Sequence, residues 1–396
     1  MEVRRGDPPT TADLVVIGGG VLGAATAFYA TRAGLRTVVI ERRPLLCTLT
    51  TPVAAGGFRL QFDNPEETEL VRESLTVFEH FSEITGLRGY DLRLQKQGYL
   101  FVTTRPDTAR RQAERVAEQR AWGVTDVELL TGDEARYRFP YLAPEIISAR
   151  FRAGDGFLDP KRLTYGYALA SSATFVLDTA VTGFTLAAGR LARVETSRGS
   201  ISTPAAVIAA GPFSGPLARL AGIDPGFTTV RRHRLTMPEV PEVPPDAPFV
   251  IDEDNGAHWR PAYQGAYLVF TDPTTPPSEP AWDVPSSSDF VFQLLDPTSE
   301  HAVAHACPFW RRVWERGSDH WILQAGQYTY TPDHRPFLGP TPVPGLYLNA
   351  GYSGHGVMGS AGGSRRVVDL ILGRADPLLN PFRWDRPLTH RPFDVI

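Results

Sequence analysis

The sequence predicts an α/β protein in which a parallel-sheet domain is interrupted by a second, α+β domain with an antiparallel sheet. Strand and helix patterns alternate at the start of the chain, over about residues 155–225, and again at the end. Residues 231–323 differ, because they are rich in proline and aromatic residues and contain short β-like runs such as 266–270. With 396 residues, the chain also exceeds the usual size of one hydrophobic core. Two domains are therefore expected.

The first element is a strand, glycine turn, helix and second strand spanning residues 14–41. Its turn contains Gly18, Gly20, Val21, Leu22 and Gly23. Gly18 permits a tight turn, Gly20 lets the backbone approach a pyrophosphate, and Gly23 lets the helix lie close to the sheet. Free N–H groups at the start of the helix bind phosphate, and Glu41 is placed to accept hydrogen bonds from a ribose diol. The unit predicts a Rossmann-type site for an ADP moiety whose ribose carries no 2′-phosphate, since two negative groups would repel.

Two later segments predict further strands that end at the same ligand. An apolar run from residue 203 ends at Ala210 and Gly211, and ligands of open α/β sheets lie outside the carboxyl ends of strands. A strand predicted at 346–350 leads through a glycine turn into a helix predicted at 363–372. The positive end of that helix would stabilise the negative charge of a reduced flavin. NAD alone would not explain contacts at this far end of the sheet, so the dinucleotide is predicted to be FAD.

Composition narrows the class of protein. The formal net charge of −4 gives no reason to expect nucleic acid or an anionic membrane as a partner. Two cysteines, Cys47 and Cys307, exclude a disulfide framework and a thiolate metal cluster, so no metal site is predicted. No apolar run is long enough to span a bilayer, and the polar segment before Asp13 lacks the apolar core of a signal peptide. A cytoplasmic protein is expected.

The glycine unit and five other segments carry a family resemblance. These segments are 18–41, 54–62, 155–160, 209–213, 331–336 and 351–356. Together they resemble the FAD-dependent amine and amino-acid oxidoreductases of the D-amino-acid oxidase superfamily, and most of all the sarcosine oxidase and glycine oxidase branch with its sarcosine oxidase β-subunit-like proteins. The resemblance implies a Rossmann-type FAD-binding domain and an inserted antiparallel-sheet substrate domain that covers the flavin. It also implies hydride transfer from the carbon next to an amine nitrogen to flavin N5, followed by hydrolysis of the imine.

By the same resemblance, further residues are predicted to contact FAD. They are Arg42, Gly57, Phe58, Arg59, Val181, Ala210, Gly211, Gly326, Gly354, His355, Gly356, Val357 and Met358. Val181 would meet the adenine through its backbone and Arg42 would lie near the ADP ribose. The loop 55–59 would lie beside the flavin ring, and residues 354–357 would border its pyrimidine edge.

The catalytic candidates are Arg59, His258, Tyr263 and His355. His258 and Tyr263 lie in a segment that resembles the strand carrying aromatic residues over the flavin, although aromatic residues at such spacing are more often core. His355 lies between two glycines, which favours a role in backbone shape or in a cofactor hydrogen bond over general-base chemistry. Arg59 could instead form a surface ion pair.

The sequence departs from the resemblance in its attachment and lysine positions. It has no cysteine just before the segment at 331 and no histidine within 47–57, so FAD is predicted to be noncovalent. Met358 stands where monomeric sarcosine oxidases place a lysine, and 265–270 lacks the lysine that speeds reaction with oxygen. This favours slower use of O2 or another electron acceptor. Arginine could substitute, and Arg234, Arg260 and Arg335 are the candidates.

The FAD-binding domain is predicted to comprise residues 1–95, 150–225 and 325–396, with a substrate domain of 96–149 and 226–324. The proline-rich stretch at 274–280 is interpreted as a surface connection. The expected partners are a small amine or amino acid and an electron acceptor, and assembly from like or unlike subunits stays open. One alternative is a noncatalytic or electron-transferring FAD subunit of a larger oxidoreductase. Another is a nicotinamide-driven monooxygenase or reductase, which would need a second glycine motif that the sequence lacks.

Overall fold

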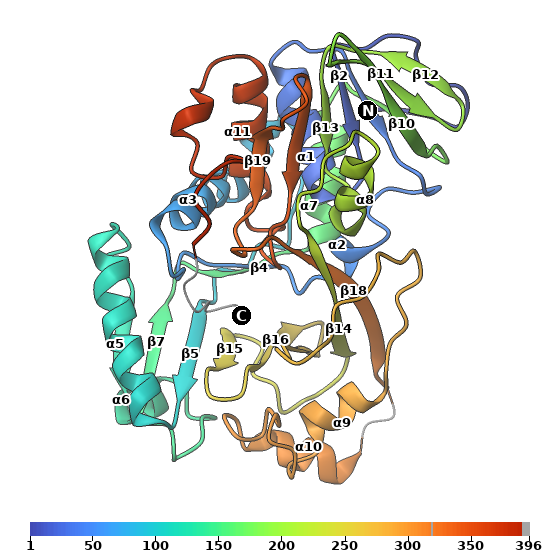
Figure 1. Cartoon of the computed structure of the whole chain (residues 1–396). Helices are drawn as coiled ribbons and strands as arrows, with labels where there is room; N and C mark the ends of the chain where they lie inside the picture. Colours follow the sequence, from blue (N-terminus) through green and yellow to red (C-terminus); the bar gives the residue numbers. More distant parts are fainter. Residues whose placement is uncertain (318–319, 390–396) are drawn as a thin grey trace.

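The computed structural model describes residues 1–317 and 320–389 and contains two large sheets (Figure 1). The first has seven strands in the order β1-β9-β3-β2-β13-β20-β19. Their bounds are β1 Glu2–Arg4, β9 Thr174–Val176, β3 Thr37–Ile40, β2 Leu14–Ile17, β13 Ala206–Ile208, β20 Leu346–Ala350 and β19 Phe337–Pro340. All neighbours are parallel except β19 and β20. The three strands predicted to end at the ligand, β2, β13 and β20, are adjacent at its centre.

Two layers cover the seven-stranded sheet, which explains why its central strands are continuously apolar. Alternate residues of a strand point to opposite faces. Leu14 and Val16 of β2 belong to a core cluster with the helices, whereas Val15 and Ile17 belong to a second cluster with a three-stranded sheet. The helices of the first layer are α1 Val21–Arg32, α3 Pro65–Glu79, α4 Phe81–Thr85, α7 Pro160–Ala170 and α11 Ser360–Ile371. The three-stranded sheet consists of β10 Val181–Ala187, β11 Arg190–Thr196 and β12 Gly199–Ser202.

Helix α11 begins at Ser360, three residues before the predicted start. The small residues that resemble a loop in the sequence instead let this helix approach α3. A Cβ atom at Gly362 would lie 2.3 Å from the carbonyl oxygen of Leu70 on α3. Helix α3 begins at Pro65, and the side chain of Asn64 accepts a hydrogen bond from the N–H of Glu67.

The second large sheet has eight strands in the order β18-β14-β17-β16-β15-β5-β7-β6. Their bounds are β5 Tyr99–Thr103, β6 Glu128–Thr131, β7 Ser148–Arg152, β14 Thr228–Met237, β15 Phe249–Asp252, β16 Ala257–Ala262, β17 Gly265–Phe270 and β18 Ile322–Tyr330. The predicted antiparallel sheet has one exception, since β15 and β5 pair in parallel. These two strands come from separate pieces of the chain, so no tight turn constrains their direction. Strands β7 and β18 cross the predicted domain limits at 150 and 325.

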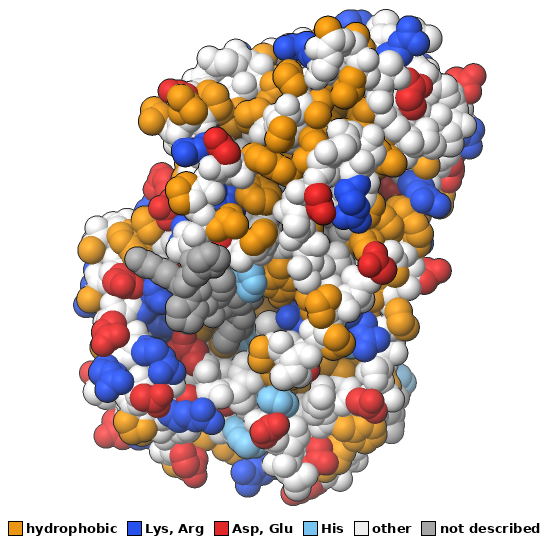
Figure 2. All heavy atoms as spheres, viewed as in Figure 1, with side chains coloured by type: hydrophobic (Ala, Val, Ile, Leu, Met, Phe, Trp, Pro, Cys, Tyr) orange, Lys and Arg blue, Asp and Glu red, His pale blue; other side chains and the backbone are white. Residues whose placement is uncertain are grey.

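Shorter elements complete the fold. Helices α9 Asp289–Leu295 and α10 Phe309–Arg316 share a core with the eight-stranded sheet, while α5 Pro106–Ala121 and α6 Gly132–Arg138 lie at its β7 end (Figure 1). The remaining elements are α2 Thr50–Val53, α8 Ser214–Arg219, the 3-10 turns Gly211–Phe213 and Pro377–Leu379, and the paired strands β4 Gly57–Phe58 and β8 Gly156–Phe157. Within the described residues, no helix has the length and apolarity that a membrane span requires. Acidic and basic side chains are interspersed on the face that Figure 2 shows.

Candidate cofactor and active site

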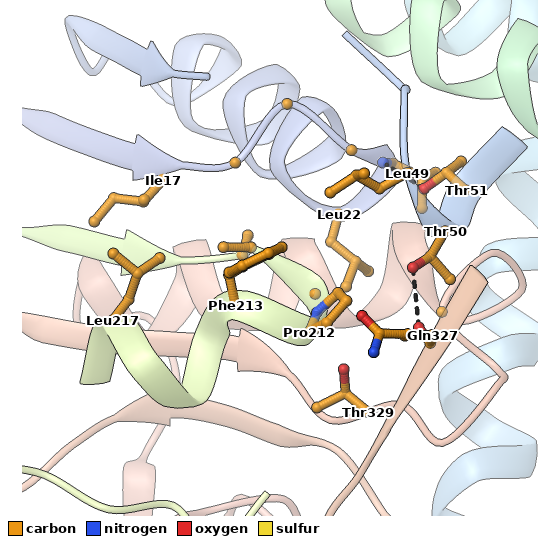
Figure 3. A pocket seen from close by; sticks show the side chains of 18 of the residues that line it. Ile17, Leu22, Leu49, Thr50, Thr51, Pro212, Phe213, Leu217, Gln327 and Thr329 are labelled. Carbon is orange, nitrogen blue, oxygen red and sulfur yellow. Dashed lines mark hydrogen bonds between the residues drawn. The ribbon is translucent and has the colours of Figure 1, made fainter. Parts of the chain in front are cut away.

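A cavity of about 370 Å³ lies at the carboxyl ends of the strands of the seven-stranded sheet. It begins where β2 and β3 end, at Ile17 and Ile40, and reaches the turn after β20. In Figure 3, Ile17 and Leu217 lie at one end of this cavity, and Thr50 and Gln327 lie at the other. Crevices at the carboxyl ends of parallel strands are where open α/β sheets bind ligands. The predicted cofactor residues that line it are Gly18, Gly20, Val21, Leu22, Glu41, Arg42, Val181, Ala210, Gly211, Gly354, Gly356 and Val357.

The glycine turn is closely packed where it meets the sheet and open where it meets the cavity. Gly18 has φ +113°, and a Cβ atom there would lie 2.6 Å from the Ala209 carbonyl oxygen. A Cβ atom at Gly23 would lie 1.9 Å from the Gly18 carbonyl oxygen. At Gly20, by contrast, the nearest atom would be Thr51 Oγ1 at 3.4 Å, and no side chain caps helix α1 there. Val21 N–H donates to Thr51 Oγ1 at 3.4 Å, and the next N–H groups of the first turn of α1 are open to an anionic ligand.

Glu41 is held rigidly in the cavity wall. Gly19 N–H donates to Oε2 at 2.7 Å, and Arg43 N–H donates to Oε1 at 2.8 Å. Burial raises the pKa of the Glu41 carboxyl, and the hydrogen bonds from Arg43 and Gly19 oppose that rise. Each carboxylate oxygen keeps a second acceptor site, so Glu41 can also accept from ribose hydroxyls. The phosphate-binding turn, this acceptor and a cavity that reaches the turn after β20 fit the binding of FAD.

Replacing Glu41 with alanine is expected to weaken FAD binding by roughly 10- to 100-fold, because hydrogen bonds to a charged group are lost on the ligand and on the Gly19 turn. A fluorescence titration of the apoprotein with FAD measures the change. Asp13 is the matched control, since this carboxylate lies at the amino end of the same sheet and pairs with Arg36 at the surface. Asp13→Ala should leave the FAD affinity unchanged, and equal losses in both variants would contradict the role of Glu41.

Seven predicted cofactor residues lie outside the cavity lining. They are Gly23, Gly57, Phe58, Arg59, Gly326, His355 and Met358. Gly23 supports the turn from behind. Gly57 lies in β4 where a Cβ atom would be 1.7 Å from Tyr99 Oη, so a larger residue does not fit. Gly326 lines a neighbouring cavity of about 290 Å³. Direct FAD contact by these seven residues stays a prediction.

Arg59 and His355 meet in a buried cluster with Glu67. Arg59 Nη2 lies 3.3 Å from His355 Nε2, and His355 Nδ1 lies 3.3 Å from Glu67 Oε1. Arginine can only donate, so Nε2 accepts and the ring proton lies on Nδ1, facing Glu67. Burial acts to raise the pKa of Glu67, but hydrogen bonds from His355 and Asn64 leave it lowered. With both ring nitrogens engaged, His355 is better suited to fixing the turn at 354–356 than to accepting a substrate proton.

The other two catalytic candidates also lie outside the lining of the main cavity. His258 is buried in β16, its Nδ1 is 2.9 Å from the Gly256 carbonyl oxygen, and burial lowers its pKa to about 4. The ring is therefore neutral near pH 7. Tyr263 lies in the turn between β16 and β17 with φ +58° and 77% exposure, and its Oη is 3.4 Å from Tyr267 Oη. Catalytic roles for both residues stay predictions.

Several lining residues were not predicted. Residues 48–51 line the cavity through α2 and the loop before it, and Gln327 and Trp282 line it from the other sheet and its connections. Thr50 Oγ1 donates to the Gln327 carbonyl oxygen at 2.9 Å (Figure 3). None of these positions has a local nucleotide-binding pattern, so only the folded chain brings them to the site. No cluster of three or more His, Cys, Asp or Glu side chains in the described part of the chain could hold a metal ion.

A family model described as FAD dependent oxidoreductase matches residues 13–370. The chain belongs to this family. The match includes the glycine turn, Glu41, the strand before Gly211 and the turn around His355. It confirms the predicted family resemblance and FAD as the cofactor.

Similar members of the FAD dependent oxidoreductase family include proteins of known name. The chain is 26% identical to FAD-dependent oxidoreductase domain-containing protein 1 of Xenopus laevis, over 94% of this chain and 81% of that protein. It is 27% identical to mitochondrial sarcosine dehydrogenase of Homo sapiens, over 97% of this chain but 42% of that protein, less than half of that relative. The L-proline dehydrogenase structure from P. horikoshii superposes with a TM-score of 0.82 at 23% identity, covering 95% of this chain and 98% of that one. This likeness confirms the α/β fold class.

Proposed function

We propose that the protein oxidises a secondary amine or an amino acid with noncovalently bound FAD. The observation that carries the proposal is the single cavity that runs from Glu41 to the turn at 354–357 and ends beside Tyr328 of the second sheet. Such a cavity lets the seven-stranded sheet bind the ADP part of FAD while the eight-stranded sheet faces the flavin ring, where the substrate reacts. The names of the relatives, a sarcosine dehydrogenase and an L-proline dehydrogenase, support an amine as substrate.

Bound FAD would supply the redox chemistry, accepting a hydride from the carbon next to the amine nitrogen, and the imine product would hydrolyse. Cys47 lines the cavity and is of the residue type that attaches FAD covalently in some members of the family. Burial raises the pKa of Cys47 to about 11, so it is protonated at neutral pH and is a poor nucleophile. This supports noncovalent binding.

Two buried arginines of the eight-stranded sheet hold residues 52–55, which lead into the loop 55–59 that is predicted to lie beside the flavin. Arg234 Nη1 donates to the carbonyl oxygens of Pro52 and Ala54 at 3.1 and 3.0 Å, and Arg260 Nε donates to Ala55 at 2.7 Å. Burial lowers the pKa of Arg260 to about 10, so it remains a cation near pH 7. The acceptors of both guanidinium groups are neutral, namely backbone carbonyl oxygens and, for Arg234, Gln324 Oε1. Their positive charge would stabilise the reduced flavin, in place of the lysines found in monomeric sarcosine oxidases.

Anaerobic reduction of the FAD-loaded protein tests this function. The flavin absorbance should bleach on addition of one member of a panel of sarcosine, glycine, proline, D- and L-amino acids and larger N-alkyl amines. Admitting air afterwards shows whether O2 or another acceptor reoxidises the flavin. Bleaching by NADPH alone would favour a nicotinamide-driven reductase. If FAD binds but no reductant substrate bleaches it, the proposal fails in favour of a noncatalytic FAD subunit.

A further inference from the structure

Residues 271–288 form a strap that connects the eight-stranded sheet to the cofactor cavity. The strap follows β17 and precedes α9, and Trp282 within it lines the cavity. The Trp282 ring stacks on Phe213, with ring centroids 3.6 Å apart and planes 11° from parallel. The guanidinium of Arg42 lies 4.4 Å from the centre of the same ring. Phe213 follows β13 and Arg42 follows β3, so one side chain of the strap spans the ends of two nucleotide-binding strands.

Two polar side chains hold the strap over the cavity. Gln327 of β18 is 3% exposed, and its Nε2 donates to Ser278 Oγ at 3.0 Å and to the Glu279 carbonyl oxygen at 2.7 Å. Its Oε1 accepts the N–H of Ala281 at 2.8 Å. From the other side, Arg43 Nη1 donates to the carbonyl oxygen of Trp282 at 3.1 Å. A buried amide that forms three hydrogen bonds to one loop fixes the path of that loop.

We propose that the strap retains FAD, with Trp282 as a cofactor-retaining residue and Gln327 as its positioning residue. Trp282 stands beside Arg42, which follows the predicted ribose acceptor Glu41, so this ring of the strap borders the ADP half of the site. FAD then enters and leaves only when the strap lifts and the Trp282 stack on Phe213 opens. The inference rests on FAD binding and is independent of which substrate is oxidised.

The test is the rate at which the loaded protein releases FAD, followed as free flavin fluorescence after dilution. Trp282→Ala should release FAD roughly tenfold faster, because an aromatic stack and a cation–π contact are lost, while Trp282→Phe should release it at close to the normal rate. Trp321→Ala is the matched control, since Trp321 is 44% exposed and lies outside the cavity lining. It should release FAD at the wild-type rate.

Gln327→Ala tests whether FAD release depends on how firmly the strap is held, because Gln327 anchors the strap through its side chain. This variant should release FAD faster and also increase amide hydrogen exchange within 271–288, because the strap loses three anchoring hydrogen bonds. If both Trp282→Ala and Gln327→Ala release FAD at the wild-type rate, the proposal is overturned. If Trp282→Ala fails to fold, the exchange and release rates of Gln327→Ala decide in the same way.

Discussion

Gly23→Ala is expected to weaken FAD binding by roughly 100-fold, because a Cβ atom cannot be accommodated behind the phosphate-binding turn. That atom would lie 1.9 Å from the carbonyl oxygen of Gly18, and both atoms are fixed by the backbone. Gly18 is itself packed against the next strand, since a Cβ atom there would lie 2.6 Å from the carbonyl oxygen of Ala209. Helix α1 must shift instead, which carries the N–H groups of its first turn away from the phosphates. Calorimetric titration of the apoprotein with FAD measures the loss.

Gly6→Ala is the control for the same substitution in open space, since a Cβ atom at Gly6 would meet nothing within 4 Å. It should bind FAD like the wild type. Thermal unfolding of both apoproteins shows whether Gly23→Ala also destabilises the fold, as overpacking between α1 and the sheet would do. Wild-type affinity in a folded Gly23→Ala protein would show that the turn does not position the phosphates.

Asp333→Asn is expected to lower the free energy of unfolding by about 3–5 kcal/mol, because it leaves the guanidinium of Arg386 buried without its counter-charge. Arg386 Nη2 and Nε donate to Asp333 Oδ1 and Oδ2 at 2.6 and 2.9 Å, and the two side chains are 6% and 0% exposed. Arg386 also donates to the carbonyl oxygens of Arg335 and Pro336. The pair therefore ties the end of the described chain to the segment before β19. Chemical denaturation measures the change.

Asp385→Asn is the matched control, since Asp385 pairs with Arg383 and is 72% exposed. Exposed pairs contribute about 0–1 kcal/mol, so this variant should unfold nearly like the wild type. Equal losses in the two variants would contradict a special role for the buried pair.

The same pair sets a direction for pH dependence. Burial acts to raise the pKa of Asp333, but hydrogen bonds and charge from Arg386 outweigh it and leave the pKa lowered. A folded pKa below the ordinary value of about 4 means that Asp333 contributes its full stability above that pH. This stability is lost as the pH falls through the folded pKa. The difference between wild type and Asp333→Asn should therefore be constant near neutral pH and shrink in acid.

Local sequence patterns predicted the glycine turn, Glu41 and the strands that end at the cavity. The turn from Gly18 to Gly23 is predictable because Gly18 and Gly23 are closely packed against the adjacent strand and the turn itself, while Gly20 leaves the turn open to the cavity. Glu41 follows from its position at the end of a strand, and the strands before Gly211 and Gly351 follow from continuous apolar runs. Of the twelve predicted residues that line the cavity, seven follow from these patterns, and the other five, Arg42, Val181, Gly354, Gly356 and Val357, were expected from the family resemblance.

The substrate half could not be predicted in the same way. Its residues come from strands whose order, β18-β14-β17-β16-β15-β5-β7-β6, does not follow the chain. The cluster of Arg59, Glu67 and His355 joins positions 288 and 296 residues apart, and no local pattern indicates such pairs. Tyr263 fits a strand of aromatic residues in sequence, yet the hairpin turn places it at the surface.

The sequence by itself determined an α/β fold, a Rossmann-type turn and a site for FAD, because those features depend on backbone conformation and on apolar runs that repeat locally. Only the tertiary structure decided what closes the site. The stretch at 274–280, interpreted from its prolines as a surface connection, belongs to the strap that carries Trp282 to Phe213 and Arg42. Long-range packing between the two sheets places the Trp282 ring, so its position cannot be predicted from the spacing of residues along the chain.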